Sequence, residues 1–115
     1  KPLTARQLAR LPLIMLEHKA NSRVYVQRFF LRKGIELNPE IELASYELMG
    51  ELARINLGLS CMVREFCAEE LRQKKVFEVN LAEPIPARSI GMVSLKGVSL
   101  PPAASRFLEL LKSLE

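Results

Sequence analysis

Apolar and polar positions in the middle of the chain follow a pattern that predicts a βαβ unit. Residues 40–44 alternate between polar and apolar, which is typical of a strand with one buried face. Residues 45–56 place apolar side chains on one face of a helix that Ser45 begins and an Asn-Leu-Gly sequence ends. The apolar run 59–63 follows as a buried strand. Such a unit leaves a helix N-terminus beside a strand end, where backbone N–H groups can hold a small polar or anionic molecule.

A short helix and a buried strand are predicted at the start of the chain. Thr4 and Gln7 have the spacing of a capping box, so one helical turn is expected over residues 5–10, and Pro12 stops it. Residues 13–16 are continuously apolar, which favours a buried strand, although a buried helical segment has the same pattern. A strand of this kind lies in the interior of a sheet.

A longer helix is predicted between this strand and the βαβ unit. Asn21 and Ser22 carry side chains of the type that begin helices, and Gly34 is the residue type that most often ends them. The alternation of strands and helices predicts an α/β fold with a mostly parallel sheet flanked by helices. In such sheets a ligand cleft lies outside the carboxyl ends of the strands.

The remainder of the chain is predicted to contain shorter elements and one terminal helix. Residues 65–75 predict a helix and residues 76–81 a strand, after which two prolines make 82–87 a stiff connector. Residues 89–95 return to an apolar pattern rich in β-formers. A final helix from Pro101 must cover some surface with its apolar stripe, which consists of Ala104, Phe107, Leu108, Leu111 and Leu114.

Composition indicates a soluble globular chain of one domain. The 115 residues are 49% hydrophobic and 26% charged, and they contain no apolar run long enough to span a bilayer. The N-terminal residues do not resemble a signal peptide, so we expect a cytoplasmic protein without a membrane partner. The net charge of +4 comes from basic residues interleaved with acids, which argues against a nucleic-acid surface on this chain.

The sequence offers little for metal binding or catalysis. Cys61 and Cys67 are too few for a disulfide framework, and together with His18, the single histidine, they are too few for a metal site. A nucleophilic cysteine would have only His18 as its base, and the sequence shows no phosphate loop or catalytic triad. We therefore expect no metal, no cofactor and no enzymatic activity.

Five short motifs occur in an order that a known family shares. They are Leu8-Ala9-Arg10-Leu11-Pro12-Leu13-Ile14-Met15-Leu16, Arg23 with Phe29-Phe30, Ser45, Leu57-Gly58-Leu59-Ser60-Cys61, and Ser105-Arg106-Phe107-Leu108-Glu109-Leu110-Leu111. In this order and spacing they resemble the C-terminal half of LysR-type transcriptional regulators. The resemblance implies one lobe of a type 2 periplasmic-binding-protein-like fold, with residues 1–95 as the second lobe of the effector-binding domain. Residues 96–115 would be a hinge and a helix that normally packs on the first lobe, which this chain lacks.

The resemblance also implies a function. In LysR-type regulators a helix-turn-helix reads DNA, and an effector domain senses a small molecule between its two lobes. This chain would then be the effector-binding part, coupling a small-molecule effector such as a carboxylate or amino acid to transcription control. It would contact DNA only through the absent N-terminal helix-turn-helix and would act as a homodimer or higher oligomer. The alternative is the lobe of a solute-binding protein from a transport or scavenging system.

The resemblance assigns the candidate effector contacts to two turns. Ser45 and Tyr46 match the strand-to-helix turn that faces the effector in the family, and residues 17–23 match a stretch that lines the cleft, including His18, Asn21, Ser22 and Arg23. Arg23 could pair bidentately with a carboxylate effector or be a solvated first-turn arginine. Ser45 could equally be a helix cap and His18 an exposed loop residue.

Two departures from the family pattern accompany these assignments. Val63-Arg64 stand where the family commonly has a proline after the glycine-centred strand, and Pro101-Pro102 stand where it has Ser-Pro. The first bears on the shape of the cleft floor, and the second removes a side-chain cap from the last helix.

Overall fold

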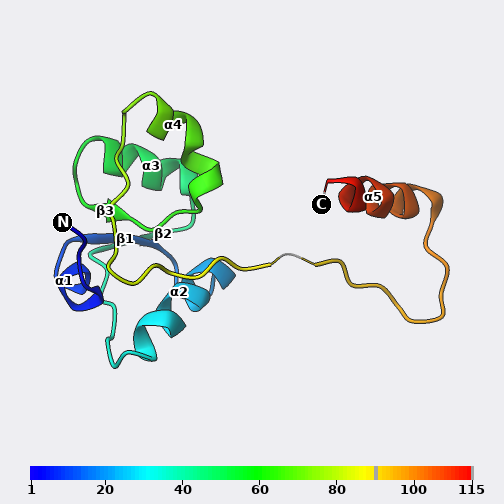
Figure 1. Ribbon diagram of the computed structural model, residues 1–115, viewed down its shortest axis with the longest axis horizontal. Helices are drawn as coiled ribbons and strands as arrows, with labels where there is room; N and C mark the ends of the chain where they lie inside the picture. Colours follow the sequence, from blue (N-terminus) through cyan, green and yellow to red (C-terminus); the bar gives the residue numbers. More distant parts are fainter. Residues whose placement is uncertain (90, 115) are drawn as a thin grey trace. The chain divides into compact units, whose positions relative to one another are not determined.

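The computed structural model describes residues 1–89 and 91–114, and these fall into two compact units (Figure 1). Unit 1 comprises Lys1–Ile85 and unit 2 comprises Pro86–Glu115. Unit 1 holds the sheet and all but one of the described helices, and unit 2 holds the terminal helix. The division into a lobe over residues 1–95 and a hinge with a helix over 96–115 refers to a longer protein and stays a prediction.

Three parallel strands form the sheet of unit 1. Strand β1 (Leu13–Leu16) lies in the centre, with β2 (Ile41–Leu43) on one side and β3 (Leu59–Ser60) on the other. Ile14 is in register with Ile41 on β2 and with Ser60 on β3. The predicted βαβ unit is therefore present, but its two strands flank β1 instead of pairing with each other. All four residues of β1 are buried, as its continuous apolar run predicts.

Helices cover both faces of this sheet, which confirms the predicted α/β class. Helix α2 (Asn21–Leu31) connects β1 to β2, and helix α3 (Tyr46–Arg54) connects β2 to β3. Figure 1 shows α2 with α1 (Ala5–Ala9) on one side of the sheet and α3 on the other. The first crossover runs from β1 to β2, and the second runs in the opposite direction from β2 past β1 to β3. Right-handed crossovers in opposite directions place their helices on opposite faces of the sheet.

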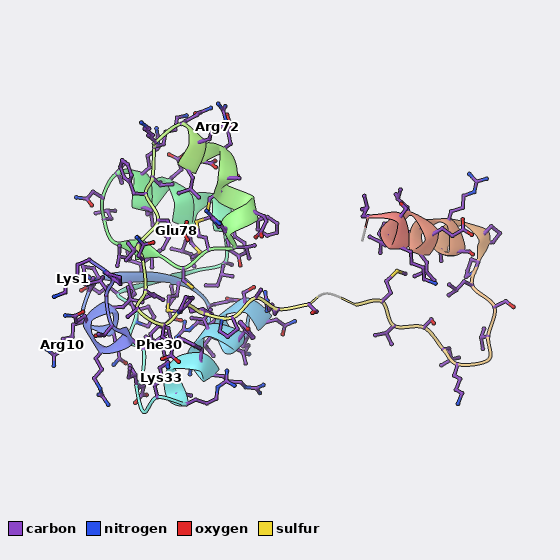
Figure 2. The ribbon with its side chains drawn as sticks, in the orientation of Figure 1. Lys1, Arg10, Phe30, Lys33, Arg72 and Glu78 are labelled. Atoms are coloured by element: carbon purple, nitrogen blue, oxygen red, sulfur yellow. The ribbon has the colours of Figure 1, made fainter. Side chains whose placement is uncertain are left out.

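Each face of the sheet has its own apolar core. On the α2 face, Leu13 and Met15 pack with Phe29 and Phe30, and the side chains of α1 pack against this cluster. On the α3 face, Ile14 and Leu16 pack with Met49. Successive residues of β1 alternate between the two clusters because side chains along a strand point to opposite faces. The side-chain view in Figure 2 shows Phe30 inside unit 1, with Arg10 and Arg72 at its periphery.

Three helix boundaries follow the predicted capping signals: the start of α1, the end of α2 and the start of α3. Thr4 and Gln7 form both hydrogen bonds of the capping box, at 3.2 Å from Gln7 N to Thr4 Oγ1 and 2.9 Å from Thr4 N to Gln7 Oε1. Gly34 has a φ of +72° after α2, and the Ile35 N–H bonds back to the Phe30 carbonyl at 3.0 Å. This is the left-handed helix ending that glycine favours. Ser45 caps α3 as predicted, and its hydroxyl accepts a hydrogen bond from Leu48 N at 3.2 Å.

A close backbone approach explains the glycine before β3. A Cβ atom at Gly58 would lie 2.8 Å from the Pro12 carbonyl oxygen and 3.3 Å from the Ile14 side chain. The same carbonyl accepts a hydrogen bond from Leu59 N at 2.8 Å, so β3 begins where the two backbones meet. Glycine permits this contact because it has no side chain.

Three predicted elements, β3 itself and the two that follow it, differ in the structure. The helix predicted over 65–75 is a 3₁₀ turn, η1 (Arg64–Cys67), followed by α4 (Ala68–Arg72), and β3 itself ends at Ser60 instead of Val63. The strand predicted over 76–81 is wrong: this segment has only an isolated parallel bridge, in which Leu3 N bonds to Asn80 O at 2.9 Å. An alternating pattern alone does not form a strand when no neighbouring strand offers a continuous ladder.

The described part of unit 2 contains one helix, α5 (Pro102–Ser113), which begins at the predicted prolines. The β-rich pattern over 89–95 forms no strand in its described residues, and Ile90 lies outside them. The apolar stripe of α5 is largely exposed, with Phe107 at 54% and Leu114 at 75% of their full accessibility. The described residues of unit 2 therefore do not bury the stripe that the sequence predicts.

Candidate functional site

The carboxyl ends of β1 and β2 bring the two predicted turns to one edge of the sheet. Residues 17–20 follow β1 and lead into α2, while residues 44–45 follow β2 and lead into α3. The strands are parallel and adjacent, so both turns leave from the same edge. A hydrogen bond of 2.9 Å from Glu17 N to the Leu43 carbonyl joins the ends of the two strands. The N-termini of α2 and α3 therefore both begin at this edge.

Ser45 and Tyr46 occupy the second of these turns. The Ser45 side chain is exposed, and its oxygen caps α3 while its own O–H proton has no acceptor among the described residues. Tyr46 is half-buried, and its ring meets the ring of Phe66 edge to face at a centroid distance of 5.7 Å. The cap role of Ser45 is thus confirmed, and its contact with an effector stays a prediction.

Asn21 and Ser22 do not cap α2 as the sequence predicts. The helix begins one residue earlier, and Ala20 occupies the N-cap position without a side-chain cap hydrogen bond. Asn21 is exposed and Ser22 half-buried in that first turn. The physical reason is the tight link to β1: Ala20 N bonds to Glu17 O at 3.1 Å, which starts the helix before Asn21 is reached. The N-cap residue of α2 consequently supplies no side-chain hydrogen bond to the helix.

Arg23 is buried, so the interpretation of it as a solvated arginine in the first turn of a helix is wrong. Only 5% of its surface is accessible, and one guanidinium nitrogen donates to the Leu16 carbonyl at 2.8 Å. The same nitrogen lies 3.5 Å from the Glu42 carboxylate. The Nε of Arg23 is buried and has no partner among the described residues. Arg23 thus links the end of β1 to β2 from the first turn of α2.

Glu42 is a member of this site that sequence reasoning missed. Its carboxylate lies between Arg23 and His18, whose Nδ1 is 4.0 Å away. The His18 side chain is 71% exposed, as an ordinary loop histidine would be, and Glu42 is partly exposed. The sequence showed Glu42 only as a polar position of the alternating strand 40–44, and the alternation predicts a solvated face for it. The structure leaves this position exposed, as predicted, and also places it beside the buried arginine.

Cys61 lies near Arg23, and its surroundings disfavour the reactive thiolate form. Burial raises the pKa of the Cys61 thiol, and the nearby Arg23 charge opposes this with a smaller effect. Burial, with a smaller contribution from Glu70, also raises the pKa of Cys67, whose Sγ lies 3.4 Å from the Arg64 carbonyl. A thiol held protonated is a poor nucleophile at neutral pH. Neither cysteine is thereby prepared for catalysis.

We expect both thiols to react slowly in the folded chain. With Ellman's reagent near neutral pH, labelling should be at least roughly tenfold slower than in urea, because the thiolate is the reactive form and folding disfavours it. The raised pKa values favour the folded state below the ordinary thiol pKa, and this contribution is lost as the pH rises through them. Equal rates in buffer and urea would contradict the raised pKa values of the two thiols.

Neither of the two pockets described for this chain involves the predicted effector contacts. One is lined by α2 residues, Tyr25, Arg28, Leu31 and Arg32, and the other by residues of α1 and of the turn after α2. The described residues contain no group of three or more His, Cys, Asp or Glu side chains that could hold a metal ion. None of the described helices has the length and apolar character needed to cross a membrane.

A protein family and two curated relatives match nearly the whole length of this chain. Residues 1–114 match the LysR substrate binding domain family. The chain is also 28% identical over 108 residues to an uncharacterized HTH-type transcriptional regulator, YeiE, of Escherichia coli K12 and of Escherichia coli O157:H7. The match covers 94% of this chain and 37% of the relative, so the chain spans a little over a third of the length of these curated relatives.

Proposed function

The chain belongs to the LysR substrate binding domain family, and from this premise we propose that it is the ligand-sensing part of a LysR-type transcriptional regulator. Effector binding would bias the arrangement of the effector domain, and the full-length regulator would convert that bias into altered DNA binding. The match over residues 1–114 carries the proposal, because it spans both the sheet and the terminal helix. The relatives described as HTH-type regulators support it.

The proposed contacts lie on the edge formed by the carboxyl ends of β1 and β2. His18 and Ser45 lie in the turns at this edge, and the helices that follow begin with Asn21, Ser22 and Tyr46. An α/β sheet places its ligands at such an edge. Arg23 was a candidate for direct pairing with an effector, but its guanidinium already bonds to Leu16 and lies beside Glu42. We therefore assign Arg23 the role of a positioning residue that holds the edge in place.

The proposed effector is a small molecule with an anionic group, such as a carboxylate or an amino acid. Two helix N-termini begin at this edge, and that of α2 has no side-chain cap. Uncapped N–H groups and the positive end of the helix dipole favour a negative charge. The Ser45 hydroxyl can donate to an effector oxygen while it continues to accept from Leu48 N.

The rest of the regulator would supply the other partners. We propose that residues 1–95 form the second lobe and residues 96–115 a hinge and a helix that packs on a first lobe encoded elsewhere in the protein. The exposed stripe of α5 is consistent with such a missing surface. DNA would be contacted through a helix-turn-helix outside this chain, and the regulator would act in the cytoplasm as a homodimer or higher oligomer. No observation favours the solute-binding alternative, and the family is one of regulator domains, not of enzymes.

Replacing Ser45 with alanine tests the site. A thermal-shift screen of the full-length regulator with the common amino acids and short carboxylates first identifies a stabilising ligand, since a molecule that binds only the folded form raises stability. We expect S45A to weaken binding of that ligand roughly tenfold, because it removes a hydrogen bond to a charged group. It should also lower the free energy of unfolding by about 1 kcal/mol through loss of the cap.

Thr4→Ala is the matched control for S45A. It removes an equivalent N-cap from α1, so it should cost about 1 kcal/mol of stability. Thr4 leads into the amino end of β1 and not its carboxyl end, so T4A should leave ligand affinity unchanged. Retention of full affinity in S45A, or an equal loss of affinity in T4A, would show that the Ser45 turn is not the effector site.

A further inference from the structure

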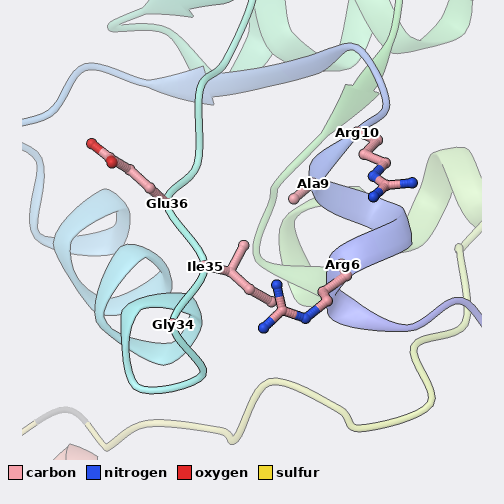
Figure 3. Close-up of a pocket in the computed structure, with 6 residues that line it drawn as sticks. All are labelled: Arg6, Ala9, Arg10, Gly34, Ile35 and Glu36. Atoms are coloured by element: carbon pink, nitrogen blue, oxygen red, sulfur yellow. The ribbon is translucent and has the colours of Figure 1, made fainter.

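A second pocket lies at the opposite end of the sheet from the proposed effector site. It lies between α1 and the turn after α2 (Figure 3). Helix α1 contributes Arg6 and Ala9 with its C-cap residue Arg10, and the turn contributes Gly34, Ile35 and Glu36. Helix α1 leads into the amino end of β1, and the turn leads toward the amino end of β2. Glu40 N bonds to Leu13 O at 2.9 Å at this end. The pocket is therefore separate from the turns at the carboxyl ends.

Two uncompensated positive charges stand at this pocket. The guanidinium groups of Arg6 and Arg10 form no hydrogen bond or ion pair with any described residue. Four other arginines have acidic partners, as Arg54 has Glu51 at 2.7 Å and Arg64 has Glu78 at 3.2 Å, whereas Arg28, Arg32 and Arg106 have none among the described residues. Like charges four residues apart on a helix repel each other, so an anion between them relieves an unfavourable interaction. Figure 3 shows the Glu36 carboxylate pointing away from both arginines.

The floor of the pocket is apolar and belongs to the core. Ile35 is only 8% exposed and forms part of the α2-face cluster, and Ala9 packs against that same cluster. Gly34 has its left-handed conformation here, and a Cβ atom built on it would meet nothing within 4 Å, so the wall on that side is open. Figure 3 shows the Arg6 side chain extending from α1 toward Ile35. A ligand would thus meet the Arg6 guanidinium beside an apolar surface, with Arg10 contributing a second positive charge at the rim.

We propose that this pocket binds a small organic oxyanion through Arg6 and Arg10, with a short apolar stem against Ala9 and Ile35. Guanidinium groups bind carboxylates and phosphates through paired N–H donors, which suits either head group. The volume of about 270 Å³ lies just below the range of about 300–1,000 Å³ common for ligand sites, so the ligand is small. The site goes beyond the proposed sensing site because it lies at the other end of the strands.

Titration of the 115-residue chain by NMR tests this proposal. The probes are butyl phosphate and butyrate, with inorganic phosphate and 1-butanol to separate the contributions of charge and stem. Butyl phosphate, butyrate or both should shift the amide resonances of Gly34 and Ile35 saturably, in the millimolar range expected for a few contacts. Inorganic phosphate and 1-butanol should bind at least roughly tenfold more weakly, because each lacks one half of the ligand. The two organic probes identify which head group is preferred.

The double variant R6A/R10A should abolish saturation by either organic probe. Both side chains are exposed, so the fold should persist, and an unchanged far-UV circular dichroism spectrum checks this. Arg106→Ala on α5, which removes another exposed arginine, is the matched control and should bind as the parent chain does. Saturation retained in R6A/R10A, equal binding of inorganic phosphate, or no saturation with any probe would each overturn the proposal.

Discussion

Replacing Phe30 with alanine is expected to lower the free energy of unfolding of unit 1 by about 3–5 kcal/mol, the range for truncating a buried aromatic side chain. Phe30 is 1% exposed and packs with Leu13, Met15 and Phe29 between α2 and the sheet. Its ring meets that of Phe29 edge to face at a centroid distance of 5.3 Å, which adds to the area it buries. Truncation would leave a cavity under the helix whose first turn forms part of the proposed effector site.

Urea unfolding followed by circular dichroism measures this change, with Phe77→Ala as its control. Phe77 is 80% exposed, so its truncation should alter the free energy of unfolding by less than about 0.5 kcal/mol. A small effect of F30A comparable to that of F77A would mean that α2 does not pack on the sheet as described. The proposed effector site would then lack the packed helix α2 that holds the loop after β1 in place.

Replacing Arg23 with methionine is expected to destabilise unit 1 by about 2 kcal/mol, the scale of a lost hydrogen bond to a charged group. Methionine preserves much of the apolar stem, so the effect isolates the guanidinium. The Leu16 carbonyl would lose its donor at 2.8 Å, and the Glu42 carboxylate would lose the cation at 3.5 Å. Arg54→Met is the control, because its exposed ion pair with Glu51 should contribute less than about 0.5 kcal/mol.

A double-mutant cycle with Glu42→Gln separates the ion pair from the hydrogen bond. Because Glu42 is partly exposed, the coupling free energy between Arg23 and Glu42 should be modest, about 1 kcal/mol. In the full-length regulator, R23M should also weaken effector binding through disorder of residues 17–22, which amide chemical shifts of that loop would report. A variant as stable as the parent chain with an unchanged loop would remove the positioning role we assign to Arg23.

These two residues indicate how the candidate site depends on the fold. Phe30 holds α2 against the sheet, and Arg23 ties the first turn of that helix to the strand ends that flank it. Neither side chain needs to contact an effector to control the site. Substitutions at both positions should therefore reduce effector affinity and stability together, whereas S45A should reduce affinity by more than its small loss of stability predicts.

Several parts of the molecule could be predicted from local sequence because local interactions cause them. The capping box of Thr4 and Gln7, the Ser45 cap and the glycine ending of α2 each depend on residues within one or two turns. The strand over residues 13–16 was predicted from a continuous apolar run, which needs a buried position whatever its neighbours are. The family resemblance, which the comparisons confirm, arose from the order of such motifs.

Other features were decided only by contacts between residues distant in sequence. The segment 76–81 alternates as a strand does but finds only Leu3 as a bridge partner, and β2 and β3 take positions on either side of β1. Arg23 was predicted to be either solvated or bound to effector, yet it is buried against Leu16 and Glu42. The sequence by itself determined which segments form helices and which one must be buried, because backbone capping and apolar periodicity are local. Tertiary structure alone decided strand order and the burial of charge, because both depend on which distant segments pack together.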